Sequence, residues 1–197
     1  REMRLPDDEI QIIRTAALLH DIGKIAIPTE ILNKPGSLSQ LEWNLIRTHP
    51  EEGASLLGDV PFSPEVAVIV RQHHERWDGS GYPLGLKKRK IHLGSRILAV
   101  ADVVETMASH RPYRPEKGLE EALREIESQK NRLYDPEVVE ACLRLFREKG
   151  YDLDGKEGSL LCVPAVSRGG LTVNPRFGNW FFREDGSPQF IVNEGWY

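Results

Sequence analysis

Four histidines and two aspartates of this chain have the chemistry to bind divalent metal ions. They are His20, Asp21, His49, His73, His74 and Asp102, and they fall at the ends of predicted helices or inside one. A single buried histidine is more often a hydrogen-bonded core residue than a ligand. Imidazole nitrogens and carboxylate oxygens brought together from separate helices, however, form a mixed ligand set that can hold two divalent ions inside a helical bundle.

Asp102 carries the strongest of these signals. It lies between Ala101 and Val103 in the nearly all-apolar run 95–108. An unpaired carboxylate is costly to bury there, so a metal ion or another strong cation partner is the simpler explanation. The run is too long for one strand and lacks strict alternation, which favours a buried central helix.

The elements that must position these residues are predicted to be helices throughout residues 1–150. A capping box of Ser39 and Glu42 opens a helix that we expect to run to His49 and to be stopped by Pro50. The other helices follow from apolar spacing and capping signals, and they are predicted over 7–20, 51–57, 64–77, 95–108, 116–130 and 136–149. About seven helices, joined by loops such as 24–38 and the glycine-rich 78–94, indicate an all-α fold.

The segment 151–197 differs in composition from the rest of the chain. It holds 8 of the 15 aromatic residues and 7 of the 17 glycines. Short β-prone runs occur at 160–166, 171–173, 180–182 and 190–192, and the pair Asp185-Gly186 is a hairpin signal. We therefore predict a small C-terminal β appendage after a main domain over 1–150. A truncated piece of a following domain, or a poorly ordered tail, explains the composition equally well.

Charge and cysteine content narrow the class of protein. The chain has 26 Lys and Arg against 30 Asp and Glu, a formal net charge of −4. This balance argues against a partner that is a nucleic-acid polymer and against membrane contact, since both depend on excess positive charge. Two cysteines form no disulfide framework, so a reducing compartment is expected, with the cytoplasm as the default. No apolar run approaches the roughly 20 residues that span a bilayer.

The strings that carry these residues resemble the signature motifs of the HD-GYP family, a branch of the HD-domain metal-dependent phosphohydrolases. Five motifs occur in family order between about residues 10 and 146: Leu18-Leu19-His20-Asp21-Ile22-Gly23-Lys24, Lys34-Pro35-Gly36, His73-His74 with Gly81-Tyr82-Pro83, the run 96–102, and Arg111-Pro112-Tyr113-Arg114. An HD doublet alone would be a weak signal, whereas five ordered motifs are highly specific. The resemblance implies an HD-domain helical bundle, with 1–150 as its catalytic domain.

This resemblance also implies an activity. Proteins of the family hydrolyse the bacterial second messenger cyclic di-GMP to pGpG or GMP by a metal-bridged hydroxide, at a centre of two or three iron or manganese ions. When the family's ligand positions are matched to this sequence, the resemblance implies that the six residues named above are metal ligands. Asp21 and Lys24 are the implied catalytic residues, with Asp21 bridging the ions and Lys24 acting on the phosphate or on the departing 3′-oxygen. The implied substrate-binding residues are Gly81, Tyr82, Pro83, Arg111 and Arg114.

One part of the family pattern has no counterpart here. The family centre also takes a glutamate and a histidine from a helix upstream of the HD motif, whereas residues 1–6 contain no histidine and are too few to form it. Because the chain begins with Arg1, we expect the natural chain to continue upstream, with a sensor or receiver domain as partner. Without that helix, two ions at most, or weaker binding, are expected. A homodimer is compatible with the same interpretation.

Two alternatives remain open at this point. The chain can be an HD phosphohydrolase of another nucleotide, or a degenerate HD-GYP domain that binds a ligand or a protein without turnover. Residues 71–117 contain ten Lys and Arg against five Asp and Glu, within an acidic chain. This locally basic segment fits a small dianionic ligand.

Overall fold

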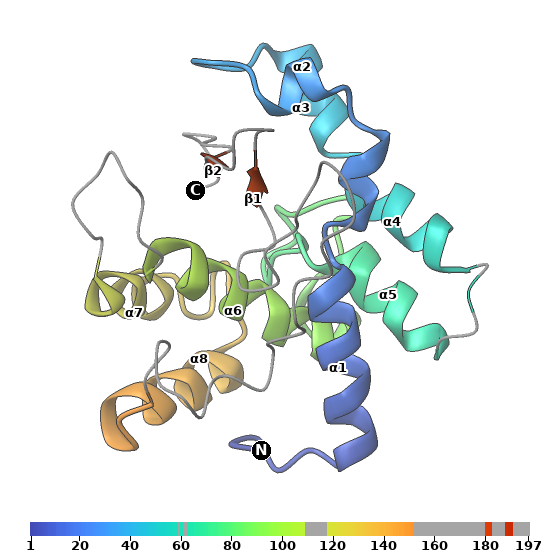
Figure 1. Ribbon diagram of the computed structural model, residues 1–197. Helices are drawn as coiled ribbons and strands as arrows, with labels where there is room; N and C mark the ends of the chain where they lie inside the picture. The colour runs from blue at the N-terminus through green and yellow to red at the C-terminus, as the bar shows by residue number, and fades with distance from the viewer. Residues whose placement is uncertain (59, 61–62, 109–117, 152–179, 183–187, 191–197) are drawn as a thin grey trace.

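Helices make up most of the chain that the structure describes. The computed structural model describes residues 1–58, 60, 63–108 and 118–151, together with the backbone of 180–182 and 188–190. Figure 1 shows α6 in the centre, with α1 and α5 on one side and α7 and α8 on the other. The helices are α1 (Asp7–Leu19), α2 (Thr29–Leu32), α3 (Gln40–Ile46), α4 (His49–Gly58), α5 (Pro64–Gln72), α6 (Leu93–Ala108), α7 (Leu119–Ser128) and α8 (Pro136–Leu143), with the short 3₁₀ helices η1 (Ile22–Ala26) and η2 (Lys88–Lys90).

The junction between α3 and α4 differs from the prediction. The expected capping box is present, since the Ser39 hydroxyl accepts from the Glu42 N–H and the Glu42 carboxylate accepts from the Ser39 N–H. The helix nevertheless ends at Ile46, and α4 begins at His49 with Pro50 in its first turn. Proline lacks an N–H that the first turn of a helix does not need. Pro50 therefore lies inside the start of a new helix, and the expectation of one helix running to His49 is wrong.

The end of α5 also differs from the prediction. This helix begins as expected with Pro64 at its first position, but it ends at Gln72 rather than near Trp77. The backbone N–H of Trp77 donates to the carbonyl of Leu133, 3.0 Å away. A tertiary hydrogen bond thus replaces continuation of the helix. The predicted loop is correspondingly shifted, because α6 already begins at Leu93.

Smaller differences occur elsewhere. The chain between α1 and α3, predicted as a loop, contains η1 and the single-turn α2. The predicted helix over 136–149 is present as α8 followed by a π-helical turn, η3 (Arg144–Glu148). Gly150 adopts a φ of +63°, as expected of a glycine that ends a helix. The main prediction of an all-α bundle is confirmed.

α6 contributes residues to two apolar clusters, which explains why its sequence is largely apolar. With α7 and α8 it forms a core that contains the fully buried Ile126 and Val139. With α1 and α5 it forms a second core that contains Ala16 and Ile69. Burial on both sides explains the apolar residues of α6, whereas the side chain of Asp102 keeps 28% exposure and lies 4.0 Å from His20. Within the described residues, no helix has both the length and the hydropathy that crossing a membrane requires.

A two-stranded antiparallel sheet occurs within the segment 151–197. β1 (Trp180–Phe182) pairs with β2 (Pro188–Phe190), and Trp180 lies opposite Phe190. This is the hairpin that the Asp185-Gly186 signal predicts, with its second strand two residues earlier than expected. The predicted strands at 160–166 and 171–173 lie outside the described residues. The division of the chain at residue 150 stays a prediction.

Candidate metal centre

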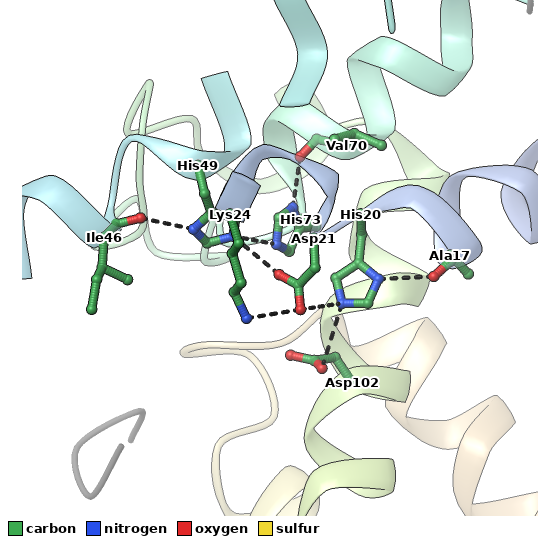
Figure 2. Close-up of polar contacts among 9 residues, drawn as sticks. All are labelled: Ala17, His20, Asp21, Lys24, Ile46, His49, Val70, His73 and Asp102. Atoms are coloured by element: carbon green, nitrogen blue, oxygen red, sulfur yellow. Dashed lines mark hydrogen bonds and ion pairs between the residues drawn. The ribbon is translucent and has the colours of Figure 1, made fainter. Parts of the chain in front are cut away.

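The six predicted metal-binding side chains come together at helix ends. His20 directly follows α1, His49 begins α4, and His73 directly follows α5. Asp21 precedes η1, His74 lies in the loop after α5, and Asp102 comes from the middle of α6. Figure 2 shows all of them except His74, with their polar groups directed toward one another. The spatial grouping that the sequence predicts is therefore present.

Three of the imidazoles are oriented by the backbone three residues before them. The Nδ1 atoms of His20, His49 and His73 lie 2.8, 2.8 and 2.6 Å from the carbonyl oxygens of Ala17, Ile46 and Val70, respectively. Because a carbonyl only accepts, Nδ1 carries a proton in each ring, so Nε2 presents its lone pair whenever the ring is neutral. The last carbonyls of a helix have no partner within the helix. The helix ends thus fix each ring in the tautomer that a metal ion requires.

Short distances connect the ligand atoms. Nε2 of His49 lies 3.2 Å from Nε2 of His73, and ligand nitrogens of these two residues and of His74 all lie within 4.8 Å of one another. One oxygen of Asp21 is 3.4 Å from Nε2 of His49, and the other is 3.4 Å from Nε2 of His20. Asp21 thereby faces both sides of the cluster, as a carboxylate shared between two metal positions would.

Burial keeps three of the imidazoles neutral. His49, His73 and His74 are almost completely buried. Burial lowers the pKa of His49 to about 4, and it lowers the pKa values of His73 and His74 well below their usual range. A neutral imidazole is the form that binds a metal ion. These three side chains are therefore ready to act as ligands at pH 7.

The charged groups of the centre lie around its two aspartates. Burial disfavours the charged form of His20, but Asp21 and Asp102 outweigh it and raise the pKa of His20 to about 9. Burial likewise opposes ionisation of Asp21, yet Lys24 and His20 hold the pKa of Asp21 well below its usual range. Nζ of Lys24 donates to Asp21 at 2.8 Å. Burial raises the pKa of Asp102, whose oxygen lies 4.0 Å from His20.

A close backbone approach holds Asp21 beside His49. A Cβ atom on Gly23 would lie 2.0 Å from the carbonyl oxygen of His49 and 2.5 Å from the backbone nitrogen of Gly53. No larger residue fits at this position unless the backbone moves. Gly23 therefore lets η1 pack directly against α4, which sets the spacing between the HD motif and the third histidine.

The loop with Gly81-Tyr82-Pro83 closes over the histidine pair. The Tyr82 ring stacks on the His74 ring with centroids 4.8 Å apart and planes 23° apart, and the Tyr82 N–H donates to the His74 carbonyl. A Cβ atom on Gly81 would lie 2.3 Å from the backbone nitrogen of Arg76, so glycine is needed for this approach. Pro83 is exposed. Burial raises the pKa of the Tyr82 hydroxyl, which keeps it protonated.

Glu75 holds the same loop in place, a role that the sequence did not assign. This buried carboxylate accepts hydrogen bonds from the backbone N–H groups of Leu84 and Leu86, at 2.6 and 2.9 Å. The available signal was a carboxylate directly after two buried histidines, where an unpaired charge is costly. Lys24 lies where it was expected, whereas Arg111 and Arg114 lie outside the described residues.

The fold and this cluster define a class of protein: a helical bundle whose buried histidines and aspartates can hold divalent metal ions. The chain belongs to the HD domain family, because the family model for the HD domain matches residues 1–138. This match confirms the HD-domain resemblance that the motifs predict.

Curated relatives and a solved structure agree with this assignment. The chain is 50% identical over 149 residues to a cyclic di-GMP phosphodiesterase of Thermotoga maritima, covering 75% of this chain and 40% of that protein. It is 46% identical over 145 residues to the cyclic di-GMP phosphodiesterase response regulator RpfG of Xanthomonas campestris pv. campestris, covering 73% of this chain and 38% of that protein. The chain thus spans less than half the length of these relatives.

The structural comparison supports the fold. A cyclic GMP-AMP specific phosphodiesterase of Vibrio cholerae has a similar structure, with a TM-score of 0.60 at 23% sequence identity. The similarity covers 79% of this chain and 43% of that chain. The all-α architecture predicted from the sequence is therefore that of a solved HD-type structure.

Proposed function

We propose that this chain is the catalytic domain of a metal-dependent phosphodiesterase that hydrolyses cyclic di-GMP. The observation that carries the proposal is the centre itself, in which Asp21 lies between His20 and His49 at 3.4 Å from each. Two relatives that carry the name cyclic di-GMP phosphodiesterase, at 50% and 46% identity, support the same substrate.

The donor set fits divalent transition-metal ions. Oriented Nε2 lone pairs and two carboxylates form the nitrogen and oxygen ligand set that suits iron and manganese. We propose two such ions, held by the six residues of the centre with Asp21 serving both, and a third where an upstream helix adds ligands. When bound, these ions supply Lewis-acid stabilisation of phosphate charge and a water of lowered pKa.

Hydrolysis requires a water oxygen to bond to phosphorus while the P–O3′ bond breaks, and a proton must reach the departing 3′-oxygen. Nζ of Lys24 lies 2.8 Å from Asp21, at the edge of the centre, and its side chain is 15% exposed. Its ammonium can donate that proton or stabilise the phosphate charge. Asp21, ionised at neutral pH, orients the ammonium through their ion pair.

The remaining assignments extend this proposal. Gly81, Tyr82 and Pro83 are proposed to line the substrate site, where a ribose or a guanine can pack against this loop. Arg111 and Arg114 are proposed to bind the second phosphate. The products pGpG or GMP, an upstream sensor or receiver domain, a homodimer and a cytoplasmic location belong to the same proposal.

The direct test uses the full-length protein. We expect protein loaded anaerobically with Fe(II) or Mn(II) to convert cyclic di-GMP to pGpG or GMP, as measured by anion-exchange chromatography. The Asp21→Ala variant should form no product and should bind less metal. Intact dinucleotide after incubation with metal-loaded wild-type protein would overturn the proposal.

The same assay separates the alternatives. Mononucleotides and 3′3′-cyclic GMP-AMP are offered in parallel with cyclic di-GMP. Faster hydrolysis of one of them would support an HD phosphohydrolase of another nucleotide. Binding of cyclic di-GMP without turnover, at full metal occupancy, would support a degenerate binding domain.

A further inference from the structure

Arg47 lies against the Tyr82 loop, next to the metal centre. Its guanidinium carbon is 5.3 Å from the centroid of the Tyr82 ring. The His74 ring stacks on the same tyrosine at 4.8 Å, with nearly parallel planes. The Tyr82 ring thus contacts both the His74 imidazole and the Arg47 guanidinium. The order is therefore His74, Tyr82, Arg47, and two ring contacts separate Arg47 from the centre.

The charge of Arg47 has no carboxylate partner among the described residues. Two of the acidic side chains close to it in sequence are paired with other cations, Glu42 with Lys34 and Glu51 with Arg71, each at 2.8 Å. The guanidinium carbon lies over the Tyr82 ring, and the N–H donors of a guanidinium point outward in its own plane. Arg47 is exposed, so these donors can reach a ligand.

The backbone fixes Arg47 relative to the metal ligands. It is the residue that ends α3, and its N–H donates to the carbonyls of Trp43 and Leu45. His49 follows two residues later, buried and hydrogen-bonded to the last carbonyl of α3. The same short link therefore holds a ligand of the centre and the guanidinium. An arginine fixed in this way loses less side-chain entropy when it binds an anion.

We propose that Arg47 binds the phosphate of the cyclic dinucleotide that is not being hydrolysed. The inference rests on the proposed function. The reacting phosphate belongs beside the ion pair of Asp21 and Lys24, whose atoms are in contact at 2.8 Å, whereas the guanidinium lies at the Tyr82 loop, two ring contacts away, where it can reach the other end of the substrate. Arginine offers a phosphate two parallel N–H donors, which fixes both position and orientation. Arg47 is thus a substrate-binding residue that acts from α3.

Two variants of the full-length, metal-loaded protein test this inference. Arg47→Met keeps an apolar side chain next to Tyr82 and removes the N–H donors of the guanidinium. Arg47→Lys keeps the positive charge and removes the pair of parallel N–H donors. We expect Arg47→Met to raise KM for cyclic di-GMP about 10- to 100-fold with a nearly unchanged kcat, and Arg47→Lys to recover part of that loss. Hydrolysis of bis(4-nitrophenyl) phosphate, which has one phosphate only, should be unchanged. Arg124→Met, which removes an exposed arginine from α7, is the matched control.

Each other result overturns the inference. A wild-type KM in Arg47→Met would show that the guanidinium does not bind the substrate. An equal loss with both substrates would show that Arg47 only supports Tyr82. If the wild-type protein itself does not hydrolyse cyclic di-GMP, the proposed function and the inference both fail. If it does and Arg47→Met behaves as Arg124→Met, the inference alone fails.

Discussion

The half of the bundle around α4 and α5 buries three imidazoles and one carboxylate beside its apolar core, whereas the half around α7 and α8 buries a larger apolar cluster and a single carboxylate, Asp135, at the start of α8. The polar set is His49, His73, His74 and Glu75. The apolar cluster, which includes part of α6, has ten buried residues, and Tyr134 is the only one of them with a polar side-chain atom. Both halves share α6, and Asp102 is its contribution to the polar side.

This difference separates the residues that stabilise the fold from those that perform chemistry. Neutral buried imidazoles close to one another contribute little to stability in the metal-free protein, because polar groups are costly to bury. The larger apolar cluster around α7 and α8 is therefore expected to contribute more to stability than the polar side chains of the site half, which has a smaller core of its own. We expect substitutions in the site half to lower activity with little change in stability, and substitutions in the half around α7 and α8 to lower stability with little change in activity.

The largest expected effect is on the site half. His73→Ala removes a fully buried ligand whose Nε2 lies 3.2 Å from that of His49. Loss of a residue that only hydrogen-bonds to a metal ligand lowers metal affinity or activity about 10- to 100-fold. Loss of a ligand itself should therefore lower kcat/KM more than about 100-fold. Metal content by mass spectrometry should fall, with little change in the Tm of the metal-free protein. His92→Asn, outside the centre, should keep metal and activity; equal losses in both variants would contradict the comparison.

The converse substitution is in the apolar half. Ile126→Ala deletes most of a fully buried side chain in the cluster of α6, α7 and α8. Deletions of this kind cost about 2–5 kcal/mol of unfolding free energy, measurable by denaturant titration. Folded Ile126→Ala should keep the metal stoichiometry of the wild type and most of its activity. A loss of metal without a loss of stability would refute the division between the halves.

The smallest effect is a pH dependence that only the site half should show. In the metal-free protein the pKa of His49 is about 4, below its unfolded value near 6.5, so stability is lost as pH falls from 6.5 through 4, by up to about 3 kcal/mol. The pKa of His20 is about 9, above its unfolded value, so its contribution is present below pH 6.5 and is lost as pH rises through 9. The Tm of the metal-free chain, measured by thermal unfolding, should therefore be highest near pH 6.5.

Two variants assign the limbs of this pH profile. His49→Gln should flatten the acid limb, and His20→Gln should flatten the alkaline limb. A profile that neither substitution changes would place the titrating groups elsewhere in the chain.

The sequence predicted the helical bundle and the grouping of the six polar residues because local patterns indicate both. His20-Asp21 stands at a helix end that apolar spacing reveals, His73-His74 falls late in the helix predicted over 64–77, and the run around Asp102 is long enough to indicate a buried helix. These features need no knowledge of tertiary contacts.

The features that the sequence did not predict depend on contacts between distant segments. The end of α5 is set by a hydrogen bond from Trp77 to Leu133, which no local signal encodes. The ring contact of Arg47 joins it to Tyr82, 35 residues later, and the lone arginine before His49 gave no hint of that partner. The sequence therefore predicts the residues of the proposed metal centre better than it predicts the residues around the Tyr82 loop.

Glu75 gives the substrate-facing loop an unusual freedom to change its sequence. It binds the N–H groups of Leu84 and Leu86 rather than their side chains, and Leu84 is 52% exposed. Because every residue except proline supplies that N–H, these two hydrogen bonds do not depend on the side chains at positions 84 and 86, whereas Gly81 in the same loop is needed for its close approach to Arg76. Positions 84 and 86 are therefore places where randomised libraries can retune the choice of nucleotide while the histidine pair beneath keeps its geometry.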